Sequence, residues 1–219
     1  MENHLAVEGL LGEMKNKILN YLGESEHSMA ELSEYLSINK TAVKEHMDSL
    51  ERMGYVKGFF KREKSGRPSK HYEITERGLD LFPKKYAELS SILLDEIQKS
   101  LGQEQLNMML SKVADRMVHH AGYSESVGKE FSREEKVDKL RNFVNALNSM
   151  GYYARMEIDK DTVKIIRHNC IFYELARTNS NVICGVLGEN VIKESGEKDF
   201  KITERFSNGG NKCVVEVGI

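Results

Sequence analysis

Proline and cysteine are both scarce in this 219-residue sequence, which has 2 prolines and 3 cysteines. It also has no apolar run near the ~18 residues that a membrane-spanning helix needs. The opening segment, MENHLAVEGLLGEMK, lacks the basic start and long apolar stretch of a signal peptide. We therefore expect a cytoplasmic protein with no membrane partner.

Neither sign of charge is in large excess, since the chain has 32 Lys and Arg and 34 Asp and Glu, for a net charge of -2. Any surface that binds nucleic acid must therefore be a local patch. The sequence contains no P-loop, no GxGxxG motif and no nucleophile elbow. A cysteine nucleophile with His168 as its base would lack a third, orienting group. We expect that the chain is not an enzyme.

Two short helices separated by a three-residue polar break are predicted between residues 28 and 53. The run SMAE, which begins at Ser28, is a capping box that starts the first helix. The second helix begins at Lys40, and Gly54 ends it. Its apolar residues recur at helical spacing and would face the first helix: Val43, Met47 and Leu50. This is the spacing of a helix-turn-helix.

A hairpin with a basic tip follows, formed by strand-like runs at 55–60 and 71–75 around the loop sequence KREKSGRPSK. The segment carries six basic residues against the single acid Glu63: Lys57, Lys61, Arg62, Lys64, Arg67 and Lys70. The positive charge that the whole chain lacks is thus concentrated here.

Residues 10–80 resemble the winged helix-turn-helix of ArsR-like and MarR-like transcription regulators. The resemblance implies a double-stranded DNA operator as partner, with the second helix in the major groove. The base-reading candidates are the polar residues at the start of that helix: Asn39, Lys40, Thr41, Lys44 and Glu45. The phosphate-contacting candidates lie in the hairpin: Lys61, Arg62, Lys64, Arg67 and Lys70.

The segment from 85 to 101 carries a long apolar stripe at helical spacing, formed by Leu89, Ile92, Leu93, Ile97 and Leu101. Some of these side chains would serve the core of their own chain. A regulator that reads DNA as a symmetric dimer also needs an interface, and we expect a homodimer through this helix. The predicted domains are a winged helix at 1–82, a helical linker and dimerisation region at 83–102, and a sensor domain at 103–219.

The sensor domain is predicted to be a small α+β unit, so the whole chain belongs to the α+β class. A capping box at Ser132 starts a helix that ends near Gly151. Strands are predicted at 153–158 and 162–166, a helix at 171–177, and a closing hairpin at 200–206 and 213–217.

All three cysteines, Cys170, Cys184 and Cys213, lie in this domain, with 13 and 28 residues between them. None forms the close pair that is typical of a zinc ribbon. Dispersed cysteines are able to converge on an iron-sulfur cluster. A zinc site, a thiol redox sensor and simple core packing stay open as alternatives.

Residues 100–219 resemble the carboxy-terminal half of SufR-type regulators of iron-sulfur cluster assembly. The shared motifs are HNCIF with ELA after it, the segment around Cys184, and GGNKCVV. The resemblance implies a [4Fe-4S] cluster held by Cys170, Cys184 and Cys213, whose state controls operator binding. The chain departs from the family at Ile171, where proline is common, and near Arg205, where a further cysteine is common. His168 is a candidate for completing the site, and a sensor of a small organic ligand is the alternative function.

Overall fold

The computed structural model describes residues 11–62, 67–124, 131–197 and 199–219. The chain divides into two compact units, 1–85 and 86–219. The first half of the long helix after the hairpin therefore belongs to the second unit. Each unit has its own hydrophobic core, and no helix of the described residues is long and apolar enough to cross a membrane.

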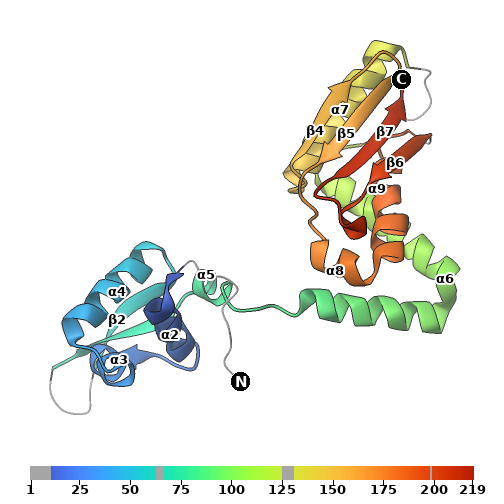
Figure 1. Cartoon of the computed structure of the whole chain (residues 1–219). Coiled ribbons are helices and arrows are strands. Elements are labelled where there is room, and N and C mark those ends of the chain that lie inside the picture. The colour runs from blue at the N-terminus through green and yellow to red at the C-terminus, as the bar shows by residue number, and fades with distance from the viewer. Residues whose placement is uncertain (1–10, 63–66, 125–130, 198) are drawn as a thin grey trace. The chain divides into compact units, whose positions relative to one another are not determined.

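The described residues of the first unit form the helices α2, α3 and α4, a small antiparallel sheet and one helical turn (Figure 1). In chain order these are α2 (Glu13–Leu22), β1 (His27–Ser28), α3 (Met29–Leu36), α4 (Lys40–Arg52), β2 (Val56–Lys61), β3 (Ser69–Ile74) and α5 (Glu76–Leu79). The sheet order is β1-β3-β2, so that β2 and β3 form the predicted hairpin. The helix-turn-helix is α3 and α4, and the wing is this hairpin.

The capping predictions for this unit are confirmed. Ser28 and Glu31 form a reciprocal capping box at the start of α3, which satisfies two otherwise unpaired backbone N–H groups. The apolar face of α4, namely Val43, Met47 and Leu50, is fully buried against α2 and α3. The opposite face of α4 is consequently left to solvent.

The second unit packs helices against one four-stranded antiparallel sheet of order β4-β5-β7-β6 (Figure 1). Its helices are α6 (Tyr86–His120), α7 (Arg133–Ser149), α8 (Tyr173–Thr178), the π-helix η1 (Asn181–Leu187), α9 (Gly188–Lys193) and the short 3-10 helix η2 (Phe206–Asn208). Its strands are β4 (Ala154–Ile158), β5 (Thr162–Arg167), β6 (Phe200–Glu204) and β7 (Cys213–Gly218). The α+β class is confirmed.

One feature of this unit was not predicted from the sequence. The segment 181–193, for which no element was predicted, is helical and begins as a π-helix. The predicted closing hairpin is present as β6 and β7, and β7 also pairs with β5, which joins both hairpins into one sheet. α6 is kinked at Gly102, which adopts a φ of 83°.

Candidate DNA-binding surface and cysteine pocket

The exposed face of α4 carries all five base-reading candidates: Asn39, Lys40, Thr41, Lys44 and Glu45. Asn39 also has a structural role, because its side-chain oxygen accepts the backbone N–H of Ala42 at 2.9 Å and so caps the helix. The Nζ of Lys44 lies 3.7 Å from a carboxylate oxygen of Asp48, and both side chains are well exposed. A base or phosphate would thus compete with only a weak surface ion pair at Lys44. Base reading by these residues stays a prediction.

The wing is less basic than the segment 57–70 indicates, because acidic residues outside that segment pair with its lysines. Lys57 pairs with Glu73 across the hairpin at 2.8 Å. Lys61 pairs with Glu26, which precedes α3. The acidic partners lie outside the loop, so a count of charges within the loop does not reveal them.

Lys70 is also engaged by its own domain. Its ammonium lies 3.3 Å from a carboxylate oxygen of Glu51 on α4 and 4.6 Å from the ring centroid of Tyr72. Its pKa is raised by the hydrogen bonds and charges of these neighbours, which outweigh the opposing effect of burial. These contacts tie the wing to α4 and indicate a structural role for Lys70.

Arg62 and Arg67 are exposed and flank the tip of the wing. Within the described part of the chain, neither guanidinium lies in an ion pair. They are therefore the wing residues most available to backbone phosphates. Lys64, the remaining phosphate candidate, lies outside the described residues.

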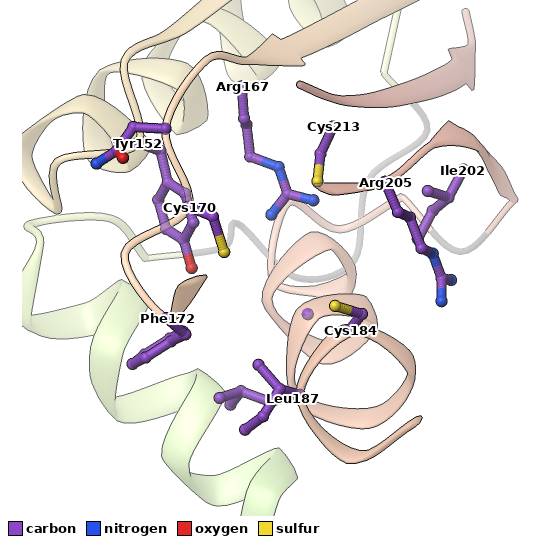
Figure 2. Close-up of a pocket in the computed structure, with 12 residues that line it drawn as sticks. Tyr152, Arg167, Cys170, Phe172, Cys184, Leu187, Ile202, Arg205 and Cys213 are labelled. Atoms are coloured by element: carbon purple, nitrogen blue, oxygen red, sulfur yellow. The ribbon is translucent and has the colours of Figure 1, made fainter. Parts of the chain in front are cut away.

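All three cysteines line one pocket in the second unit, which we call the cysteine pocket (Figure 2). Cys170 follows β5, Cys184 lies in η1 and Cys213 begins β7. The pocket is lined by Tyr152, Arg167, Asn169, Cys170, Phe172, Ile183, Cys184, Leu187, Gly188, Ile202, Arg205 and Cys213. Figure 2 shows the three sulfur atoms directed toward a common space, with the Arg167 side chain entering it from the sheet.

A strained turn places Tyr152 at this pocket. Gly151 has a φ of 95° and Tyr153 a φ of 48°, a conformation that is uncommon for a bulky residue. The backbone N–H of Asn169 donates to the carbonyl of Tyr152 at 3.0 Å, and the Asn169 side chain donates to the carbonyl of Gly151 at 2.8 Å. The turn is thus fastened to the segment that leads into Cys170. Burial raises the pKa of Tyr152 to about 12, so its phenol is neutral at physiological pH.

His168 is not among the residues that line the pocket. It directly follows the last residue of β5 and is exposed. The structure therefore does not bring His168 together with the three cysteines. The polar residues that sequence reasoning missed at the pocket are Tyr152, Arg167, Asn169 and Arg205.

Backbone N–H groups are directed at two of the sulfurs. The N–H of Phe206 donates to the Sγ of Cys213 at 3.4 Å, and the N–H of Phe172 donates to Cys170. Hydrogen bonds of this kind favour a metal-bound thiolate and tune iron-sulfur clusters. Burial nevertheless raises the pKa of the Cys170 thiol above its usual value.

The described residues form no ready-made site for a single metal ion. Across residues 11–62, 67–124, 131–197 and 199–219, no three His, Cys, Asp or Glu side chains are arranged to hold one metal ion. A cluster binds its thiolates through separate irons, so its ligands surround a volume rather than a point. The cavity measures about 40 Å³. A cavity of this size holds a few water-sized groups, so a cluster requires its walls to separate.

A family model described as a winged helix DNA-binding domain matches residues 15–93. No curated protein matches the chain. Among solved structures, the adhesin competence repressor (AdcR) of Streptococcus pyogenes is 19% identical, with 65% of this chain and 84% of that chain covered and a TM-score of 0.30. ZitR of Lactococcus lactis, as the C30AH42A mutant in apo form, is 18% identical over 64% and 83%, with a TM-score of 0.29. The similarity to these two structures is too low to support an inference, whereas the family match identifies the first unit as a winged helix DNA-binding domain.

Proposed function

We propose that the chain is a transcription regulator whose second unit holds an iron-sulfur cluster that controls operator binding. The observation that carries the proposal is the convergence of Cys170, Cys184 and Cys213 on one pocket, although 13 and 28 residues separate them in sequence. Thiolates are the preferred protein ligands of iron-sulfur clusters. When bound, the cluster would supply sensitivity to oxygen, redox state or iron supply.

The three sulfurs would hold the cluster, and the N–H groups of Phe172 and Phe206 would support two of them. The wall that carries Cys184 is η1, a π-helix, and π-helices are rare elements that are frequent at functional sites. η1 packs against α6, and Asn179, just before it, donates a hydrogen bond to Ser91 of α6 at 2.8 Å. Movement of the Cys184 wall would therefore be transmitted to α6.

We further propose that α6 forms a homodimer interface. Its first half keeps a row of apolar side chains exposed, with exposed fractions between 52% and 71%: Tyr86, Leu89, Ile92, Leu93 and Leu101. Its second half is buried in its own unit through Leu106 and Leu110. A two-fold interface would cover the exposed row and set the spacing of the two α4 helices on DNA.

The alternative of a thiol redox sensor is less well supported. Reactive cysteines have a lowered pKa, because the thiolate is the nucleophile. Burial raises the pKa of Cys170 instead. A sensor of a small organic ligand would use the apolar wall of the same pocket, formed by Phe172, Ile183, Leu187 and Ile202. The experiment below separates this possibility from the cluster.

The test is anaerobic purification with measurement of iron, sulfide and visible absorbance. We expect stoichiometric iron and sulfide and a broad charge-transfer band near the visible range. Each of the variants Cys170→Ser, Cys184→Ser and Cys213→Ser should lose most of the absorbance, since serine is a poor ligand for this soft site. Val182→Thr is a matched control, because it adds a hydroxyl to the same π-helix outside the pocket lining. Protein without iron and sulfide would refute the cluster and favour the organic ligand.

A further inference from the structure

Arg167 lies at a position of β5 where the alternation of the strand predicts a buried apolar residue. Alternate residues of a strand share a face. Val163 and Ile165 are fully buried in the core of the second unit. Arg167 continues the same face, and it is 7% exposed. A charged side chain thus lies where the two preceding positions are aliphatic.

The strand register places this arginine beside one of the cysteines. Arg167 is directly opposite Cys213 in the antiparallel pair of β5 and β7, in continuation of the Ile165–Val215 pair. Directly opposite residues have side chains on one face with Cβ atoms about 5 Å apart. Figure 2 shows the guanidinium of Arg167 directed into the space between the three sulfurs.

The charge of Arg167 has no counter-ion in the described part of the chain. Its Nε is buried without a hydrogen-bond partner, and no carboxylate there forms an ion pair with it. The guanidinium instead makes a cation–π contact with Tyr152, 5.3 Å from the ring centroid. Arg205, the other arginine of the pocket, differs because it is paired with Glu189 at 2.8 Å.

A buried, unpaired charge is costly and is normally compensated by an opposite charge. The residues that line the pocket include no aspartate or glutamate. The three thiols are the lining groups that acquire negative charge when they bind metal. The compensation for Arg167 must therefore come from an occupant together with the cysteines that hold it.

We propose that Arg167 makes the cysteine pocket an anion site, in which its guanidinium is the counter-ion of a negatively charged iron-thiolate occupant. This inference rests on the proposed function, since it specifies the charge of the group bound there. Arg167 is a positioning residue that acts through charge and hydrogen bonding. Its charge stabilises the protein when the pocket is occupied and destabilises it when the pocket is empty.

The test compares Arg167→Met and Arg167→Lys with the wild type, with and without bound iron. Arg177→Met is the matched control, because Arg177 also lies over a tyrosine, at 5.9 Å from the Tyr173 ring, but is exposed and outside the pocket. In competition with a chelator, Arg167→Met should bind its iron about 10 to 100 times more weakly, which is the usual effect of changing a residue that supports metal ligands. The midpoint reduction potential of the bound cluster should shift to more negative values, since a cation that favours the reduced form is gone. Arg167→Lys should partly restore both the iron retention and the reduction potential.

The metal-free proteins supply the second measurement. If the charge of Arg167 is uncompensated there, Arg167→Met should melt at the same temperature as the wild type or higher. A merely structural arginine would instead lower the melting temperature in both states.

Two negative results are distinguishable. A wild type that binds no iron overturns the proposed function and this inference with it. The inference alone is overturned if the wild type loads normally and Arg167→Met matches it in iron retention and reduction potential. It is also overturned if Arg167→Met is destabilised equally with and without iron.

Discussion

Removal of the two unpaired arginines of the wing should flatten the salt dependence of DNA binding. Arg62 and Arg67 flank the wing tip and have no ion pair within the described residues, whereas Lys57, Lys61 and Lys70 are paired with carboxylates. Each phosphate contact contributes about 0.9 to the slope of log K against log salt concentration. The proposed homodimer has two wings, so the double variant Arg62→Ala/Arg67→Ala removes four contacts and should bind with a slope that is shallower by about 3.6.

This slope difference is large enough to measure. Over a fourfold rise in salt, from about 50 to about 200 mM, the affinity of the wild-type dimer should fall roughly 150-fold more than that of the double variant. Fluorescence anisotropy with a labelled duplex of arbitrary sequence is sufficient, because phosphate contacts carry no sequence information.

The control must change the net charge equally. Arg141→Ala/Arg155→Ala also removes two exposed arginines, but both lie in the second unit and are paired with Asp138 and Glu157. Its slope should equal that of the wild type. Equal slopes for the wing variant and the wild type would refute the assignment of the wing to DNA, and a shallower slope in the control would show that net charge alone is responsible.

Three further predictions concern the other candidate surfaces. Lys44→Ala and Thr41→Ala should each cost ~1–3 kcal/mol of binding to a selected operator, with little change on unrelated duplex, and equal losses on both would contradict base reading. Leu93→Glu should sediment as a monomer and Glu96→Gln, on the same helix, should not; a monomeric wild type at micromolar concentration would dispose of the interface. The hydrogen bond from the Ser28 backbone lowers the pKa of Glu31, so its contribution to stability is present above the unfolded pKa of about 4.3 and lost as pH falls through the lower folded value. The wild type should thus melt higher than Glu31→Gln at neutral pH and lose this difference in acid, and a constant difference would argue against the linkage.

The sequence predicted the first unit well because its signals are local. The capping box at Ser28 and the stripe on α4 each lie within a few residues, and both elements form where expected. The ion pairs of the wing were missed because Lys61 and Glu26 are 35 residues apart, and Lys70 and Glu51 are 19 apart. Long-range pairing depends on the fold, which a charge count does not contain.

In the second unit, the convergence of the three cysteines was expected, but the elements that achieve it were only partly predicted. The segment NVICGVL forms a π-helix, whose i to i+5 bonding does not follow the 3.6-residue period by which helices are recognised. Arg167 could have been found, since the alternation in TVKIIR places it on the face of Val163 and Ile165. That pattern marks a charged residue directed toward the core.

The arrangement of η1 leads to a last prediction, on metal removal. Cys184 ties one side of η1 to the cysteine pocket, and its other side packs on α6. Loss of the proposed cluster would free the Cys184 side, so the local opening of η1 should then become easier. In hydrogen exchange, the metal-free protein should exchange faster at residues 181–187 and in the turn of α6 around Ser91, which Asn179 holds by its hydrogen bond.

The exchange pattern also tests the route of the change. In Ser91→Ala, the faster exchange should remain at 181–187 and weaken in the turn of α6 around residue 91, because the hydrogen bond from Asn179 is lost there. Exchange of α4 in protein without DNA should be the same with and without metal, since α4 belongs to the other unit. Equal exchange at 181–187 in both metal states would show that η1 does not respond to the pocket, and a uniform increase across both units would indicate global destabilisation instead of a local switch.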